Sequence, residues 1–255
     1  MQWILQEYED TSRLAEVLDR AGETYSLHKV VPFVGELDPE PNIVDPNVVM
    51  FGSYSLRHYA RQHGLTPGVW ELRPYLNEYA WQEYLLNGPH NTRKVLLKDL
   101  GGLPLDDTLY FIRPVEDSKE IAGTVMDVNE ILYTVKSVMG LRPDEYIQGS
   151  LRPDTEMMLG TPVNIQAEWR NWIVGDELIT SSLYKQGRKV LYREGIDDDA
   201  REFVKDMVAC NPGYAGAYVL DVCRSDGQLY ILETNCINAA GFYAADLNKL
   251  VGALA

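Results

Sequence analysis

Two apolar runs near the C-terminal end, joined by Asp226-Gly227, constrain the fold of this chain more than any other feature. Residues 217–223 and 228–233 are rich in Val, Leu, Ile and Tyr, and an Asp-Gly pair between two such runs indicates a β-hairpin. The first run contains Asp221, and the second leads into Glu233-Thr234-Asn235. We therefore expect an antiparallel pair of strands that carries carboxylates among apolar side chains.

The register of this hairpin decides whether its acidic side chains can act together. Glu233 and Asn235 share a face because successive side chains of a strand alternate. A three-residue loop of residues 226–228 brings Asp221 opposite Glu233, whereas a two-residue loop sends them to opposite faces. Two carboxylates and an amide oxygen on one face suit Mg²⁺, so we expect a three-residue or bulged turn. In the alternative, two ordinary strands hold their acids in solvent.

The length of 255 residues suits two domains, or one domain with a large subdomain. Over the first 75 residues, short apolar runs alternate with amphipathic segments such as 12–21, which predicts a small α/β domain. Pro67-Gly68 marks a turn near its end. The aromatic-rich residues 75–100 are expected to be helical.

The composition argues against several classes of partner. Lys and Arg number 23 and Asp and Glu 38, a net charge of −15, so we expect no nucleic acid partner. The three cysteines form no C-x-x-C motif, which argues against a disulfide framework and a structural zinc site. No apolar run predicts a membrane-spanning helix, and the first ten residues do not resemble a signal peptide. We expect a cytoplasmic protein that does not contact membranes.

The segment from Asp221 to Glu233-Thr234-Asn235 resembles the metal signature of ATP-grasp enzymes. In that superfamily an Asp on one strand, and a Glu and an Asn two apart on the next, hold the magnesium ions that bridge the ATP phosphates. The resemblance covers most of the chain and implies an α/β fold. Residues 1–75 would form an N-terminal pre-ATP-grasp α/β domain, and residues 76–255 an ATP-grasp domain of two α+β subdomains. ATP and Mg²⁺ are the implied cofactors, with Asp221, Glu233 and Asn235 as metal ligands.

A strand that ends in Phe111-Ile112-Arg113 is followed by a loop that contains Lys119. This pattern is similar to the Arg/double-Lys clade of the superfamily, found in bacteria and their viruses, and implies that both cations contact the ATP phosphates. Arg113 stands where most of the superfamily has Lys. Its planar guanidinium can bind two phosphate oxygens, which implies a different geometry of phosphate contact. In the alternative, both are surface cations without a partner. Either Lys94 or Lys98 supplies a further lysine that binds the nucleotide, or both simply lie on the solvent-exposed face of a helix.

A second cationic block is Glu168-Trp169-Arg170, which resembles a strand of the same clade and is followed by Tyr184-Lys185. The resemblance implies that Arg170 and Lys185 are catalytic and hold the phosphate or acyl-phosphate. Glu168 would orient Arg170 or a ribose. The alternative is a plain cross-strand charge pair, because a Glu and an Arg two apart share a face of a strand.

Two further segments are candidates for binding. Met157-Met158-Leu159 occupies the family's hinge position, so Met158 and Leu159 would contact adenine, although adjacent Met residues also serve as core packing. Gly52-Ser53 precedes a helix whose N-terminus could receive a substrate carboxylate, or it forms an ordinary tight turn.

The resemblance implies an ATP-dependent ligase that joins a small-molecule or peptide carboxylate to an amine through an acyl-phosphate. The chain lacks the G-x-x-x-x-G-K-[ST] phosphate loop and the G-x-S-x-G nucleophile motif. Three alternatives stay open. They are a small-molecule kinase, a nucleotide-binding module without catalysis, which Arg113 favours, and a structural α/β protein in which Asp221 and Glu233 point apart.

Overall fold

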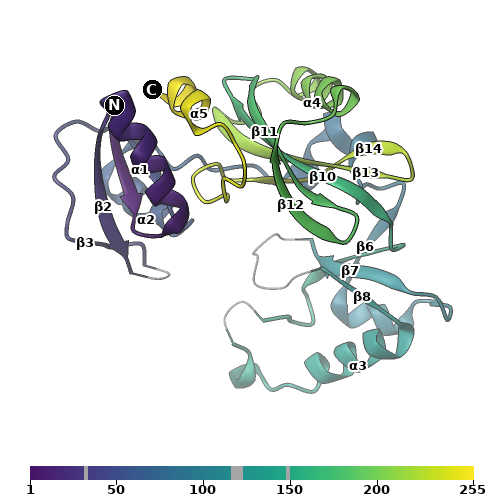
Figure 1. Cartoon of the computed structure of the whole chain (residues 1–255). Coiled ribbons are helices and arrows are strands. Elements are labelled where there is room, and N and C mark those ends of the chain that lie inside the picture. The colour runs from purple at the N-terminus through teal and green to yellow at the C-terminus, as the bar shows by residue number, and fades with distance from the viewer. Residues whose placement is uncertain (32–33, 116–122, 148–149) are drawn as a thin grey trace. The chain divides into compact units, whose positions relative to one another are not determined.

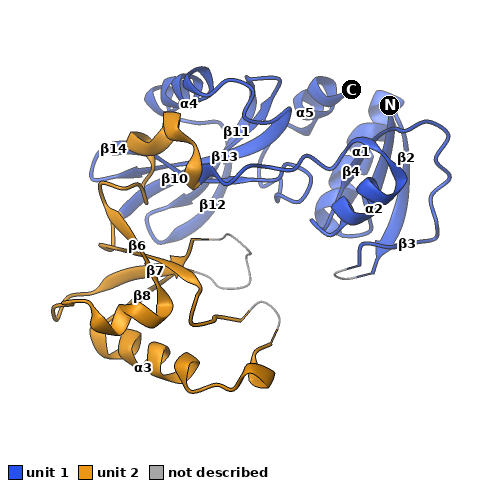
Figure 2. Ribbon diagram, turned by 180° about the vertical axis from the view of Figure 1, so that it is seen from behind, with its two compact units in different colours: residues 1–75, 165–255 blue, residues 76–164 orange. Residues whose placement is uncertain are grey.

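The computed structural model describes residues 1–31, 34–115, 123–147 and 150–255. The chain forms two compact units, one of residues 1–75 and 165–255 and the other of residues 76–164 (Figure 2). The first unit therefore contains the expected N-terminal domain and the C-terminal part of the expected ATP-grasp domain. Among the described residues, no helix has both the length and the apolar character needed to cross a bilayer.

The N-terminal part of the first unit is a five-stranded sheet in the order β3-β2-β1-β4-β5, with two helices (Figure 1). β1 runs parallel to β2 and β4, β4 runs parallel to β5, and β3 is antiparallel to β2. This alternation of strands and helices confirms the expected α/β character. The elements are β1 (Gln2–Gln6), α1 (Glu9–Ala21), β2 (Thr24–Val30), β3 (Leu37–Asp38), β4 (Asn47–Phe51), α2 (Leu56–His63) and β5 (Thr66–Gly68).

The C-terminal part of the first unit is an antiparallel sheet in the order β12-β11-β10-β13-β14. One face packs on α4, where Trp169 and Leu183 meet Ala200. Trp172 points to the opposite face and packs with α5. The elements are β10 (Ile165–Val174), β11 (Glu177–Gln186), β12 (Lys189–Glu194), α4 (Asp198–Cys210), β13 (Ala217–Ser225), β14 (Gln228–Asn235) and α5 (Leu247–Leu254).

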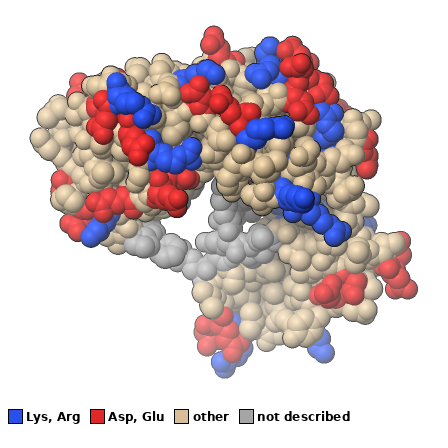
Figure 3. Space-filling view, in the orientation of Figure 1, with Lys and Arg blue, Asp and Glu red and all other residues tan. Residues whose placement is uncertain are grey.

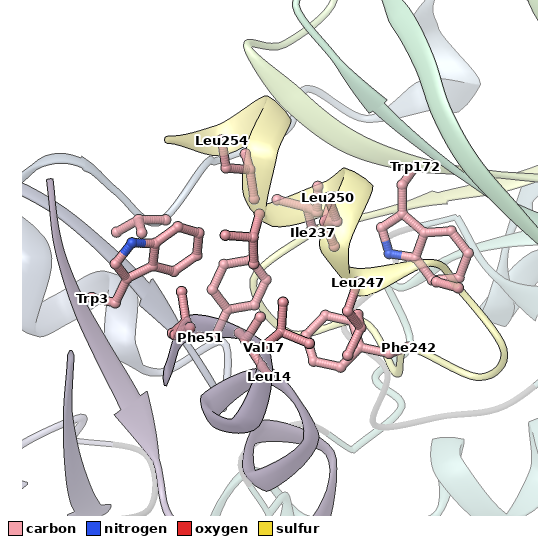
Figure 4. Close-up of a cluster of buried hydrophobic side chains, with 14 of the residues drawn as sticks. Trp3, Leu14, Val17, Phe51, Trp172, Ile237, Phe242, Leu247, Leu250 and Leu254 are labelled. Atoms are coloured by element: carbon pink, nitrogen blue, oxygen red, sulfur yellow. The ribbon is translucent and has the colours of Figure 1, made fainter. Parts of the chain in front are cut away.

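A shared hydrophobic core joins these two parts of the first unit. Figure 4 shows Trp3 and Phe51 of the N-terminal sheet and Leu14 and Val17 of α1 with side chains from the end of the chain. The C-terminal contributors include Trp172, Ile237, Phe242, Leu247, Leu250 and Leu254. Burial of this apolar surface stabilises the contact between the N-terminal sheet and the segment that follows β14.

The β13–β14 hairpin closes with a two-residue loop, so the expected three-residue loop is wrong. Ser225 pairs with Gln228, and both loop residues have positive φ, 50° at Asp226 and 77° at Gly227. An Asp-Gly pair favours this tight turn. The register then shifts between Asp221 and Val222, because a bulge at Leu232 adds one residue to β14. The bulge pairs Asp221 with Glu233, which confirms the predicted pairing.

The second unit holds a four-stranded sheet in the order β6-β9-β7-β8. The expected helix over residues 75–100 is correct only in part. That region contains 3₁₀ helices and the strand β6, which pairs with β9 about sixty residues later. The elements are the 3₁₀ helices η1 (Tyr75–Asn77), η2 (Tyr79–Tyr84), η3 (Leu97–Gly102) and η4 (Pro143–Glu145), the strands β6 (Thr92–Leu96), β7 (Tyr110–Pro114), β8 (Thr124–Met126) and β9 (Glu156–Gly160), and α3 (Val128–Met139).

Candidate active site

A buried ion pair between Arg170 and Asp221 lies at the centre of the β10–β14 sheet. The two residues are direct cross-strand partners on β10 and β13. The guanidinium donates from Nε to Asp221 Oδ1 at 2.9 Å and from Nη2 to Asp221 Oδ2 at 2.7 Å. Asp221 is fully buried and Arg170 is 7% exposed. A bidentate pair out of water fixes the orientation of both groups.

Asn235 links this pair to a second carboxylate. Its Nδ2 donates to Asp221 Oδ2 at 3.1 Å and to Glu233 Oε1 at 2.9 Å. Asn235 and Glu233 meet on one face because they lie two apart on β14, as predicted. The amide nitrogen, which carries partial positive charge, therefore lies between two carboxylates. The electrostatics of this position favour a cation.

The pKa of Asp221 reflects first its burial and then the charges around it. Burial raises its pKa to about 6, the Arg170 guanidinium opposes this shift, and the carboxylates of Glu233 and Glu168 add to it. Burial would lower the pKa of Arg170, but the adjacent Asp221 carboxylate raises it above the usual value, so the guanidinium stays charged. The ionised form of Asp221 therefore costs free energy that another cation would offset.

Glu168 forms a separate set of contacts on the same sheet. Its carboxylate accepts a hydrogen bond from the Tyr184 hydroxyl at 2.7 Å and contacts Lys185 Nζ at 2.6 Å. Glu168 is buried, whereas the Lys185 side chain is 39% exposed. Glu168 and Lys185 are cross-strand partners on β10 and β11, so the charge pair of Glu168 is with Lys185 and not with Arg170.

An aromatic stack beside Arg170 was not foreseen from the sequence. The guanidinium carbon lies 4.6 Å from the centre of the Tyr243 ring, and Tyr243 stacks on Tyr184 at 5.1 Å and on Tyr192 at 4.8 Å. Arg170 Nη1 also donates to the carbonyl of Gly241 at 3.3 Å. Tyr243 has a φ of 48°, which is uncommon for a residue with a side chain and marks a constrained loop. No spacing in the sequence indicates this backbone conformation, so the sequence carries no signal for the aromatic stack.

The described residues contain no group of three His, Cys, Asp or Glu side chains arranged to hold a metal ion. The set expected from the sequence is of another kind, two carboxylates and one amide. Asp221, Glu233 and Asn235 do converge, although Asp221 already accepts hydrogen bonds from Arg170 and Asn235.

In the second unit, Arg113 and Lys94 flank Met158 in one cross-strand row. Met158 pairs with Lys94 of β6 and with Arg113 of β7, so Lys94 lies on a strand and not on a helix. Met158 is fully buried, and Arg113 Nε donates to the carbonyl of Pro114 at 3.2 Å. Leu159 belongs to the hydrophobic core of this unit, so it faces away from Met158.

The remaining cationic candidates lie elsewhere in the chain. Lys98 is exposed on η3, outside the row of Lys94 and Arg113. Lys119 falls outside the described residues.

The turn at Gly52-Ser53 offers little to a carboxylate. The amide of Ser53 already donates to the side-chain Oε1 of Gln6 at 2.6 Å. A side chain at position 52 would come within 2.5 Å of Gln6 Cβ, so only glycine fits there. These contacts agree with the ordinary tight turn rather than with a carboxylate site.

A family model for the ATP-grasp domain of the Arg/double-Lys clade, family 2, matches residues 90–252. The chain belongs to this ATP-grasp family. The match confirms the resemblance to the superfamily and to this clade. It runs from just before β6 to within α5, and so includes Arg113, Arg170, Asp221, Glu233 and Asn235. A comparison with curated protein sequences finds no match.

Solved structures agree with the ATP-grasp fold over the whole chain. A D-cycloserine synthetase has a TM-score of 0.60 at 12% identity, covering 100% of this chain and 98% of its own. An L-amino acid ligase from Bacillus licheniformis has a TM-score of 0.59 at 12% identity, covering 99% and 75%. A D-alanine–D-alanine ligase from Bacillus anthracis, complexed with ATP, has a TM-score of 0.56 at 10% identity, covering 99% and 96%. At such identities the similarity establishes the fold.

Proposed function

We propose that this ATP-grasp protein is an ADP-forming ligase that joins a carboxylate to an amine. The substrate carboxylate attacks the γ-phosphate of ATP and forms an acyl-phosphate. The amine then displaces phosphate, so a C–N bond replaces the C–O bond of the mixed anhydride. The observation that carries the proposal is the convergence of Arg170, Asp221, Glu233 and Asn235 on one face of the sheet. The names of several similar structures, which are ligases of amino acids, support it.

Asp221, Glu233 and Asn235 fit a magnesium ion by the chemistry of their donors. Carboxylate and amide oxygens are the ligands that Mg²⁺ prefers. The raised pKa of Asp221, caused by burial and by Glu233, agrees with a position that gains from a further cation. Bound Mg²⁺ would offset the negative charge of the ATP phosphates. In that state the amide oxygen of Asn235, rather than its nitrogen, has to face the ion.

Arg170 is the residue best suited to hold the transferred phosphate. Its contacts with Asp221 and Gly241 use Nε, Nη2 and Nη1 once each. A guanidinium has about five N–H groups, so about two can still donate to phosphate oxygens. Asp221 and the carbonyl of Gly241 fix the plane of the guanidinium, so those donors are oriented before the substrate arrives.

The other cations take supporting roles in the proposal. Lys185 lies next to Glu168 and, being partly exposed, can contact the acyl-phosphate, while Glu168 orients Lys185 or binds a ribose. Arg113 and Lys119 bind ATP phosphates. The cross-strand row favours Lys94 over Lys98 as a further nucleotide-binding lysine.

The remaining assignments concern adenine and the domains. Met158 and Leu159 form the adenine-binding segment, through backbone groups in the case of Leu159, whose side chain is in the core. We assign residues 1–75 to the substrate-side domain and residues 76–255 to the ATP-grasp domain. The β1–β5 sheet and its two helices support the first assignment.

The reaction can be tested by product analysis. The purified protein is incubated with ATP, Mg²⁺ and pairs drawn from a panel of amino acids and short peptides. In each pair one member supplies the carboxylate and the other the amine. A ligase releases ADP and free phosphate and forms an amide that mass spectrometry detects. A phosphorylated product without amide would identify a kinase instead. A complete lack of ADP with every substrate would favour a nucleotide-binding module without catalysis.

A further inference from the structure

The outermost strand of the catalytic sheet, β12, has an open backbone edge. In the part of the chain that the structure describes, it pairs with β11 on one side and with no strand on the other. All its residues are exposed, and the three consecutive apolar residues Val190, Leu191 and Tyr192, called here the apolar row, are 68, 43 and 56% exposed. Exposed apolar edges readily pair with other chains, and proteins usually avoid them or cover them.

The β11–β12 hairpin carries a group of cations, although the net charge of the whole chain is negative. Arg188, Lys189 and Arg193 flank the apolar row in a chain whose net charge is −15. Lys and Arg side chains gather over the β11–β12 hairpin in the view of Figure 3. Within the described residues none of these three cations forms an ion pair. Cations can protect an edge from aggregation, but they do not explain three consecutive exposed apolar side chains.

The open edge is continuous with the candidate active site. Val190 is the cross-strand partner of Lys185, which contacts Glu168. Tyr192 stacks on Tyr243, and the Tyr243 ring in turn lies against the guanidinium of Arg170. A chain bound along β12 would therefore be separated from Lys185 by β12 alone, and from Arg170 by β12 and β11.

We propose that β12 binds an extended acidic peptide by strand addition and so presents a peptide carboxylate to the active site. Backbone hydrogen bonds to the open edge would supply affinity for any extended chain. Arg188, Lys189 and Arg193 select acidic side chains, and apolar side chains of the peptide pack on the exposed apolar residues of β12. A second copy of β12 is disfavoured, because the same cations would then face each other. Use of the bound peptide as a substrate rests on the proposed function, whereas the binding itself does not.

Fluorescence anisotropy with the full-length protein tests the binding without nucleotide. The probe is a labelled peptide of alternating Glu and Val, compared with a Lys–Val peptide and with a Glu–Val peptide N-methylated at every amide. The acidic peptide should bind and the basic one should not. N-methylation keeps the charge but removes the backbone donors, so it should weaken binding about tenfold or more. Equal binding of the N-methylated peptide would overturn strand addition.

Matched double variants test the site. Arg188→Gln with Lys189→Gln should weaken binding of the Glu–Val peptide about fivefold. Arg20→Gln with Lys136→Gln removes the same charge from exposed positions of α1 and α3 and should leave binding unchanged. Equal effects of the two double variants, or no binding of the acidic peptide, would overturn the proposal. Since ADP formation with small carboxylates is measured separately, such a failure would leave the ligase assignment intact.

Discussion

At the residue scale, the main feature of the candidate active site is the buried Arg170–Asp221 ion pair. Its two members lie about fifty residues apart, and only the register of β10 and β13 brings them together. Strand pairing at this distance is set by the packing of the whole sheet. The sequence therefore predicted both residues as site candidates but not their contact.

Replacing Arg170 should destabilise the fold. Arg170→Gln leaves the fully buried Asp221 without its cation and next to Glu233. Loss of one partner of a buried pair costs about 3 to 5 kcal/mol. Urea denaturation at neutral pH measures this change. The control is Lys205→Gln, which breaks an exposed pair with Glu202 and should change the free energy of unfolding little. Similar effects of the two substitutions would contradict the structure.

Asp221 should also make stability depend on pH. Its pKa of about 6 in the folded protein lies above the ordinary value of 3.8, so between these values the folded state binds more protons than the unfolded state. The contribution of this group is fully present below the unfolded pKa and is lost as pH rises through about 6. The free energy of unfolding, measured from pH 4 to pH 7, should therefore fall less with rising pH in Asp221→Asn. Identical pH profiles would contradict the assigned shift.

At the element scale, the segment between β14 and α5 connects the active site with the N-terminal sheet. Gly241 and Tyr243 contact Arg170. The Tyr243 carbonyl accepts a hydrogen bond from Arg13 Nη1 of α1 at 2.9 Å. Asn238 bonds to both β4 and β5. Sequence patterns did not reveal the role of this segment, because these contacts are made with residues far away along the chain.

Tyr243 should act as a positioning residue for Arg170. Tyr243→Leu removes the ring that packs on the guanidinium, so kcat should fall about tenfold while KM for ATP changes little. Tyr243→Phe keeps the ring and should restore most of kcat. Steady-state kinetics of ADP release separates the two parameters. If Phe and Leu reduced kcat equally, the ring would not be what positions Arg170.

Asn238 should hold the N-terminal sheet to the catalytic sheet. Its Nδ2 donates to the carbonyls of Met50 and Gly68, and its Oδ1 accepts from the amide of Trp70. Asn238→Ala leaves these buried groups without partners, at a cost of about 3 kcal/mol. Thermal unfolding should detect this loss, whereas Asn248→Ala on the exposed side of α5 serves as the control. An equal effect of both substitutions would exclude the role of Asn238.

At the scale of the whole molecule, local patterns predicted the fold where neighbouring residues decide it. The α/β character of residues 1–75 and the hairpin at Asp226-Gly227 follow from periodicity and turn chemistry. The predictions failed where distant residues decide. Residues 92–96 form a strand because β9 pairs with them, and the bulge at Leu232 supplies the residue that was expected in the turn. The aromatic stack on Arg170 has no local signature at all.

In the proposed function, Asp221, Glu233 and Asn235 hold the magnesium ion that ATP brings to this sheet. Isothermal titration calorimetry of ATP, with and without Mg²⁺, tests it in the unmodified protein, in Glu233→Gln and in the control Glu202→Gln on α4. ATP should bind tightly only with Mg²⁺, about tenfold more weakly in Glu233→Gln and with unchanged affinity in Glu202→Gln. Equal ATP affinity with and without Mg²⁺, in all three proteins, would contradict it.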